Sequence, residues 1–283
     1  MNLTISRSDR TVGATVNDVS LSELSEHAFE QIRDLVHERG VVAIKNQDLS
    51  PAQQVRFASR FGELQKIFIK EALASDYPEL FFVSNILENG KPIGSMDAGR
   101  FWHTDGAYLP KPHNVSMLYA IEVPQKDGKA LGDTVFTGMG AAYDALPDVM
   151  KRRIDGLRAV HSLYHRYGVK TENAEAMAKR SADFPPVSHP LAIRHPVTGR
   201  RCLYVSEGYT SAIEGQPEDE SRALLKELCE HSVQAQFQYT YSWAPGDLLI
   251  WDNRAMMHRA TFDYALPQRR LMRRATVAGE VLG

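Results

Sequence analysis

Residues 248–258 have the sequence Leu-Leu-Ile-Trp-Asp-Asn-Arg-Ala-Met-Met-His, which combines a strand, a turn and a candidate ligand. The apolar run from Leu248 to Trp251 indicates a buried β-strand. The polar residues 252–254 are typical of a turn that brings the chain back. His258 follows two methionines, and a histidine in apolar surroundings needs a partner for its ring nitrogens. The stretch therefore predicts a buried strand, a reversal, and a histidine that binds either a metal or a hydrogen-bonding group of the core.

Short runs of β-type residues recur on both sides of this stretch and are separated by turn residues. The expected strands lie at residues 41–44, 80–83, 116–123, 134–136, 191–195, 201–205, 237–243 and 271–277. Helices are expected at about 26–38, capped by Ser25, from the capping box at Ser50 to about Phe61, at about 140–154 and at about 218–231. Many short strands with segregated helices favour an α+β fold around an antiparallel double sheet of jelly-roll type.

The chain has 283 residues and shows no internal repeat or linker, so a single domain covering residues 1–283 is expected. Residues 88–100 contain three glycines and a proline and are expected to form a loop, a candidate lid. Lys and Arg total 33 and Asp and Glu total 35, a net charge of 33 − 35 = −2. Such a balance provides no overall field that would attract nucleic acid or an anionic membrane.

Two further features of the sequence bear on location. The cysteines, Cys202 and Cys229, do not form a Cys-x-x-Cys pair, and the first ten residues lack the apolar stretch of a signal peptide. No window of 18 residues is continuously apolar, which argues against a membrane span. A cytoplasmic protein without membrane or nucleic-acid partners is expected.

A second candidate for metal binding is the segment Trp102-His103-Thr104-Asp105. In an extended segment His103 and Asp105 point the same way, so they can share one metal ion. The alternative is a surface ion pair. A third ligand is needed, and His258 is the best placed of ten histidines, although it could equally be a core histidine. The histidines at 113, 161, 165, 189, 195 and 231 are assigned to loops, surfaces or packing.

The third candidate is the basic segment 269–276, Arg-Arg-Leu-Met-Arg-Arg-Ala-Thr. In a strand Arg270, Met272 and Arg274 share one face, and the two arginines stand about 13 Å apart, enough for two separate anions. An inward arginine is costly unless an anion or a carboxylate pairs with it. The alternative is a solvated basic strand end that pairs with surface acids.

Taken together, four ordered motifs resemble those of the taurine dioxygenase and 2,4-dichlorophenoxyacetate dioxygenase family. They are His103-Thr104-Asp105, Gly132-Asp133-Thr134, Trp251-Asp252-Asn253-Arg254 followed by His258, and the basic segment 269–276. Residues 61–64 and 141–146 also resemble family segments, and the similarity runs from about residue 12 to the C-terminus. It implies a double-stranded β-helix (jelly-roll, cupin-like) core with flanking helices.

The same resemblance implies the cofactors and their residues. Fe(II) would be bound by His103, Asp105 and His258, with no catalytic residue beyond these ligands. Thr134 and Arg270 would bind the far carboxylate of the co-substrate 2-oxoglutarate, and Arg274 would hold the acidic group of the substrate. Three protein ligands leave positions for a chelating keto acid and for O₂.

The implied activity is hydroxylation of a small anionic organic substrate, such as an aryloxyacetate, with release of succinate and CO₂. Residues 65–70, Gln-Lys-Ile-Phe-Ile-Lys, lack the histidine that helps bind the sulfonate in taurine enzymes, and Lys70 would approach the substrate acid instead. Tyr209 and Tyr167 would line the substrate pocket. For these three residues the alternatives are a surface lysine and packing aromatics. The alternative functions are an alkylsulfonate or alkylsulfate dioxygenase and a non-catalytic cupin-like metal sensor. Homo-oligomers are common in the family.

Overall fold

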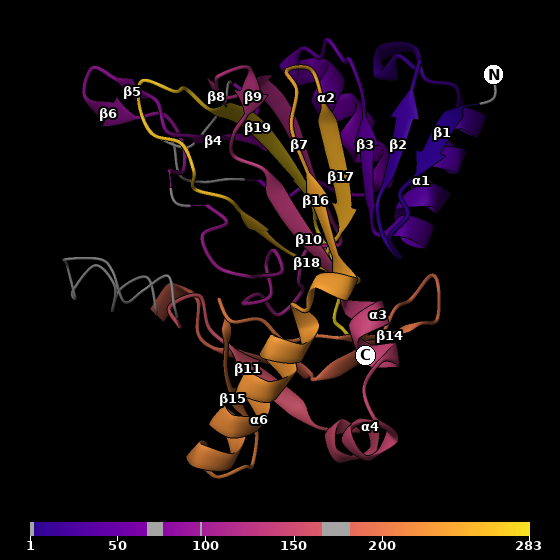
Figure 1. The fold of residues 1–283 in the computed structure, drawn as a ribbon, viewed down its shortest axis with the longest axis vertical. Coiled ribbons are helices and arrows are strands. Elements are labelled where there is room, and N and C mark those ends of the chain that lie inside the picture. Colours follow the sequence, from indigo (N-terminus) through magenta and orange to yellow (C-terminus); the bar gives the residue numbers. More distant parts are fainter. Residues whose placement is uncertain (1–2, 67–75, 97, 166–181) are drawn as a thin grey trace.

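The computed structural model describes residues 3–66, 76–96, 98–165 and 182–283 (Figure 1). Its largest sheet has seven strands in the order β1-β2-β3-β17-β7-β19-β4. All neighbours in this sheet are antiparallel except β2 and β3, which are parallel. The strands are β1 (Thr4–Arg7), β2 (Ala14–Asn17), β3 (Val41–Ile44), β17 (Leu248–Asp252), β7 (Val115–Glu122), β19 (Leu271–Val277) and β4 (Leu80–Ser84).

A smaller sheet has the order β16-β10-β18, with β16 (Gln238–Tyr241), β10 (Thr134–Gly138) and β18 (Met256–Ala260). The turn after Asp252 carries the chain from β17 in the large sheet to β18 in the small one. Phe136 of β10 contacts Trp251 of β17 with ring centroids 5.7 Å apart, so side chains of the two sheets meet in a buried layer. The strand, the reversal and the returning segment predicted for residues 248–258 are confirmed.

Helices α1 (Glu26–Arg39) and α2 (Pro51–Ala58) contribute to the core on one side of the large sheet. Ser25 accepts a hydrogen bond from the backbone of Ala28, and the capping box of Ser50 and Gln53 is present, as predicted. A short 3-10 helix, Ser59–Phe61, extends α2. These helices form where the sequence predicts them because their starts are determined by local hydrogen bonds.

The helix predicted at 140–154 is wrong in one respect, because the structure has two helices, α3 (Met139–Asp144) and α4 (Asp148–Ile154). Pro147 stands between them, immediately before α4. A proline inside a helix removes one backbone hydrogen bond and clashes with the carbonyl group four residues earlier. The long helix α6 (Glu218–Ser232) matches its prediction. No helix in the described ranges has the length and apolar character that crossing a membrane requires.

Part of the loop predicted at 88–100 is ordered against the large sheet. It contains most of a hairpin, β5 (Leu87–Glu88) and β6 (Lys91–Pro92), and Ser95 exchanges backbone hydrogen bonds with Phe82 and Ser84 of β4. Gly94 has a φ of +94°, and a Cβ there would lie 2.3 Å from the carbonyl oxygen of Phe82. A second hairpin joins β8 (Gln125–Lys126) and β9 (Lys129–Ala130).

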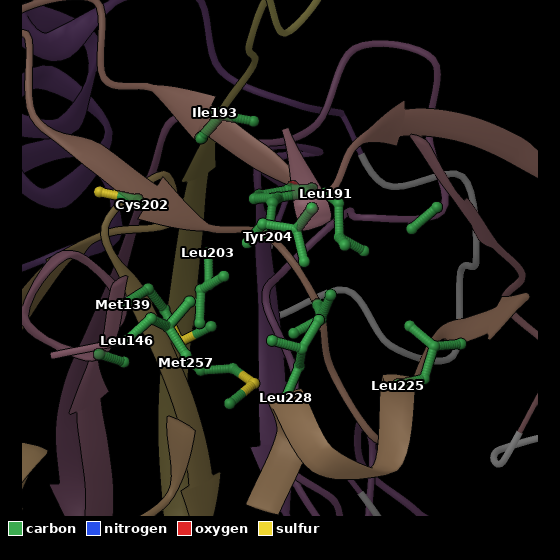
Figure 2. Close-up of a cluster of buried hydrophobic side chains, with 14 of the residues drawn as sticks. Met139, Leu146, Leu191, Ile193, Cys202, Leu203, Tyr204, Leu225, Leu228 and Met257 are labelled. Carbon is green, nitrogen blue, oxygen red and sulfur yellow. The ribbon is translucent and has the colours of Figure 1, made fainter. Parts of the chain in front are cut away.

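The lower part of Figure 1 holds short sheets that the sequence predicted only in part. The pair β13 (Ala192–Arg194) and β14 (Arg201–Leu203) falls inside predicted strands. The three-stranded sheet of β12 (Val187–Pro190), β11 (Arg158–His161) and β15 (Thr210–Ile213) was not predicted. Figure 2 shows the buried apolar cluster of this part, to which Met257 of β18 contributes. Because strand side chains alternate, Met256 instead joins the layer between the two main sheets.

The buried side chains of His161 and His189 lie next to each other in this lower part, with ring centroids 5.3 Å apart. Burial, together with the neighbouring His189, lowers the pKa of His161 from 6.5 to about 3. The unfolded chain therefore binds more protons than the folded one below pH 6.5, and stability falls as the pH falls.

We expect His161→Gln to reduce the loss of unfolding free energy between pH 7 and pH 5 by about 2 kcal/mol. Urea denaturation at both pH values measures it. The exposed His27 provides the control, since His27→Gln should keep the pH dependence of the unmodified protein. If the stability of His161→Gln depended on pH as that of the unmodified protein does, the loss of stability between pH 7 and pH 5 could not be assigned to His161.

Candidate metal centre

Three potential metal ligands from distant parts of the sequence lie together. The backbones of His103 and His258 form an isolated bridge with N–O distances of 3.1 and 2.9 Å. Asp105 follows two residues later, and one ligand atom from each of the three side chains lies within 4.8 Å of the others. All three residues are buried. The structure thus brings together the three residues predicted as ligands, and their binding of iron stays a prediction.

The two imidazoles each turn Nε2 toward the carboxylate of Asp105, at 3.4 Å for His103 and 3.8 Å for His258. Nδ1 of His103 lies 2.8 Å from the carbonyl oxygen of Phe101, so Nδ1–H donates there and fixes the orientation of the ring. Nδ1 of His258 is buried without a hydrogen-bond partner among the described residues. Burial, with His103 close by, holds the pKa of His258 well below its ordinary value, so this ring is neutral.

The carboxylate of Asp105 uses its two oxygens differently. Oδ2 accepts a hydrogen bond from Ser116 at 2.7 Å and pairs with Nη2 of Arg274 at 2.5 Å. Oδ1 lies 3.4 Å from Nε2 of His103. Burial alone would raise the pKa of Asp105, but Arg274 and the two imidazoles outweigh it and hold that pKa well below its ordinary value. Two imidazoles and one carboxylate fit Fe(II) and leave open positions for other ligands.

A cavity beside these side chains is lined by His103, His258, Thr134, Arg270 and Arg274. Thr134 lies in β10 and its hydroxyl oxygen accepts a hydrogen bond from Nε1 of Trp243 at 3.0 Å. Because that oxygen is already an acceptor, the hydroxyl proton of Thr134 remains available to an anion in the cavity.

Arg270 precedes β19 and is 2% exposed. No carboxylate in the described part of the chain pairs with its guanidinium group, whose Nε is buried without a partner. Burial lowers the pKa of Arg270, although its contact with Tyr264 opposes this. Gly132 has a φ of +75°, and a Cβ there would lie 2.9 Å from the Tyr264 ring and 3.2 Å from Nε of Arg270. A buried guanidinium without a carboxylate is suited to an anionic ligand.

The arginines of β19 divide between two faces. Arg274 lines the same cavity as Arg270, as the strand period predicted. Arg273 on the opposite face is also buried, where Nε donates to Gln54 of α2 at 2.7 Å and Nη2 to the carbonyl oxygen of Leu49 at 2.5 Å. The alternative of a solvated basic strand end is therefore wrong for these three arginines. Of the segment, Arg269 does pair with a surface acid, Glu122.

Aromatic residues lie on one side of the metal centre. The buried Tyr209 contacts His103 with ring centroids 5.9 Å apart and Tyr108 at 5.2 Å. Tyr108 had not been singled out from the sequence, and His113 had been assigned to loops, surfaces or packing. Both ring nitrogens of His113 are buried without partners among the described residues, and burial lowers its pKa to about 4. Lys70 and Tyr167, the other predicted pocket residues, lie outside the described residues.

A second group of possible ligands consists of His37, His195 and Asp252. Arg254 binds both oxygens of Asp252 at 2.9 and 2.7 Å, so a guanidinium already neutralises this carboxylate. Nδ1 of His195 accepts backbone N–H groups of residues 197 and 198, and its Nε2 donates to Asp252 at 3.0 Å. The hydrogen bonds of this group converge on Asp252 and stabilise the turn after β17.

Two histidines and one carboxylate beside a cavity are the ligand set of mononuclear non-haem iron oxygenases. Comparisons with known proteins agree with this class. A family model described as "Taurine catabolism dioxygenase TauD, TfdA family" matches residues 4–276, and the chain belongs to that family. The chain is 37% identical over 279 residues to an alpha-ketoglutarate-dependent 2,4-dichlorophenoxyacetate dioxygenase of Burkholderia sp. (strain RASC), covering 95% of this chain and 91% of the relative.

Solved structures give the same result. A structure of AAD-2 in complex with Mn(II) and N-oxalylglycine has a TM-score of 0.82 and 33% identity and covers 99% of this chain and 98% of AAD-2. A taurine dioxygenase from Burkholderia xenovorans has a TM-score of 0.82 and 29% identity, with coverage of 99% and 90%. These comparisons confirm the predicted family and the predicted class of activity, a 2-oxoglutarate-dependent dioxygenase that uses a metal. The fold is confirmed as a mixed α/β fold with a large, mostly antiparallel sheet.

Proposed function

We propose that this chain hydroxylates a small organic acid, with aryloxyacetates as the leading substrates, in a reaction that consumes 2-oxoglutarate and O₂. The observation that carries the proposal is a single cavity lined by His103, His258, Arg270 and Arg274, with Asp105 paired to Arg274 at its wall. The overall change is C–H + 2-oxoglutarate + O₂ → C–OH + succinate + CO₂, which balances without a further reductant.

Each of the candidate site residues has a separate task in this proposal. His103, Asp105 and His258 would hold Fe(II), which together with 2-oxoglutarate supplies the oxidation by O₂. Thr134 and Arg270 would bind the far carboxylate of 2-oxoglutarate through a hydroxyl proton and a guanidinium group. Arg274 would attract the acidic group of the substrate and so position the C–H bond. It also pairs with Asp105, so it would share its charge between this carboxylate and the substrate acid.

The choice of an aryloxyacetate rests on relatives. Two dioxygenases for 2,4-dichlorophenoxyacetate are each 37% identical to this chain, and an (S)-phenoxypropionate dioxygenase of Sphingobium herbicidovorans is 31% identical over 277 residues. An alkylsulfonate or alkylsulfate substrate is the second candidate, supported by the likeness to the taurine dioxygenase structure. The same relatives are named as dioxygenases, which disfavours a metal sensor without catalysis. Lys70, Tyr209 and Tyr167 remain proposed pocket residues.

The proposal also covers the fold topology, the cellular location, the oligomeric state and a role for one loop. The fold would be a double-stranded β-helix forming one domain over residues 1–283, a topology that the two facing sheets support. A cytoplasmic location is supported by two free cysteines, Cys202 and Cys229. Assembly into homo-oligomers is proposed from the resemblance to the family. The segment 88–100 would act as a lid.

Turnover of phenoxyacetate tests the substrate assignment. Hydroxylation beside the ether oxygen gives a hemiacetal that breaks down to phenol and glyoxylate, so phenol and succinate should appear in equal amounts. Taurine and an alkyl sulfate, assayed in parallel, test the second candidate. Succinate formation with these two compounds and none with phenoxyacetate would replace the leading substrate by the second candidate.

A further inference from the structure

Ser116 occupies a central position behind the candidate metal centre. It lies in β7 between two strands, paired in register with Trp251 of β17 and with Thr276 of β19. The residue is fully buried, and its hydroxyl group makes three contacts. Its Oγ lies 2.7 Å from Oδ2 of Asp105, 3.0 Å from Nδ2 of Asn253 and 3.2 Å from Nη2 of Arg274. One hydroxyl group thus touches a candidate ligand, an amide and the candidate substrate arginine.

The direction of each hydrogen bond in this group follows from chemistry alone. The indole nitrogen of Trp251 can only donate, and it lies 3.0 Å from Asn253. The amide oxygen of Asn253 must therefore face the indole, which turns the amide N–H₂ toward Ser116. Arg274 also can only donate. Ser116 then accepts from both neighbours, and its single hydroxyl proton has one remaining acceptor, Oδ2 of Asp105.

We propose that the relay Trp251–Asn253–Ser116 positions Asp105 as a ligand that binds the metal through Oδ1 alone. The proposal rests on the proposed function, because it assumes that Asp105 binds the metal. Oδ2 receives two donors, from Ser116 and Arg274, whereas Oδ1 faces His103 and no donor from the relay. Ser116 is in this sense a positioning residue that acts through Asp105.

The relay has a consequence for the metal. A carboxylate that binds a metal through both oxygens occupies two coordination positions, whereas binding through one oxygen occupies only one. The position left open is needed by 2-oxoglutarate or O₂. Groups that hold a metal ligand from behind commonly change metal affinity by about 10- to 100-fold when they are removed. Ser116 and Asn253 should therefore affect metal binding although neither is a candidate ligand.

The test is a titration of the metal-free full-length protein with Mn(II), with free Mn(II) measured by electron paramagnetic resonance. Ser116→Ala removes the hydroxyl group. Asn253→Asp keeps the shape but replaces the donor with an acceptor, so the proton of Ser116 turns away from Asp105. Both variants should bind Mn(II) about 10- to 100-fold more weakly, and both should shift the visible absorption of the anaerobic Fe(II)·2-oxoglutarate complex.

Ser232→Ala is the matched control, because Ser232 is equally buried but lies at the end of α6 and donates to the carbonyl oxygen of Leu228. It should leave both measurements unchanged. Binding of Mn(II) by Ser116→Ala and Asn253→Asp within about threefold of the unmodified protein would overturn the relay alone. If Ser116→Ala does not fold, Asn253→Asp decides. If the unmodified protein binds no Mn(II), or His103→Ala binds it equally well, the metal site itself is overturned.

Discussion

Substitution of His258 by alanine is expected to abolish metal binding and, with it, the release of succinate. The ring of His258 packs between Phe136 and Trp251, with centroid distances of 5.7 and 4.8 Å, so it cannot be replaced by a neighbouring donor. Only His103 and Asp105 would remain. We expect the affinity for Mn(II) to fall by more than about 100-fold, beyond what loss of a group behind a ligand costs. Titration with Mn(II) and the anaerobic Fe(II)·2-oxoglutarate absorption measure the change.

His231→Ala provides the control for loss of an imidazole. His231 is partly buried in α6 and hydrogen-bonds the carbonyl oxygen of Ala142 at 2.8 Å, away from the three candidate ligands. This variant should lose some stability and keep its metal. If His258→Ala still bound Mn(II) and gave the Fe(II)·2-oxoglutarate absorption, one of the remaining histidines would have to be the third ligand.

Substitution of Arg270 by methionine is expected to raise the KM for 2-oxoglutarate by about 30- to 1000-fold. Removing one partner of a buried charge pair commonly costs about 2 to 4 kcal/mol, which corresponds to this range. The metal-free protein should be as stable as before or more stable, because methionine removes a buried guanidinium that no carboxylate in the described part of the chain neutralises. Steady-state kinetics and urea denaturation measure the two effects.

Arg273→Met is the matched control on the same strand. Arg273 is buried on the opposite face and donates to Gln54 and to the backbone of Leu49. Its loss should therefore lower stability and leave the KM for 2-oxoglutarate near its original value. The reverse pattern, with 2-oxoglutarate affinity sensitive to Arg273 and indifferent to Arg270, would place the co-substrate on the other side of β19.

The elements that the sequence predicted well are those with local causes. The hydrogen bond of Ser25, like those between Ser50 and Gln53, joins residues only three positions apart in the sequence. The buried strands at 41–44 and 248–251 are unbroken apolar runs. By contrast, the strands at 158–161 and 187–190 hold buried histidines in place of apolar residues, so their burial leaves no apolar pattern. The hairpin at 87–92 is exposed and has no pattern to detect.

The residues of the candidate site also fall into those that the sequence indicates and those that only the three-dimensional structure reveals. Periodicity alone indicated His103 and Asp105 as neighbours, and the ordered motifs selected His258 from ten histidines. Ser116 and Asn253 could not be found by periodicity, because they are 137 positions apart and their contact depends on the pairing of β7 with β17. The burial of Arg273 depends on α2 covering the second face of the sheet. Side chains whose role comes from a partner on another strand carry no local signal.

The alternation of side chains along β18 links the metal centre to the stability of the whole chain. Met256 packs between the two main sheets, Met257 packs into the lower apolar cluster, and His258 faces the candidate iron site. Moving this strand aside to open the centre would expose apolar surface in both cores at once. Release of the metal by that route would thus require something close to global unfolding, so exchange of the ion would proceed through the cavity mouth while the strand stays in place.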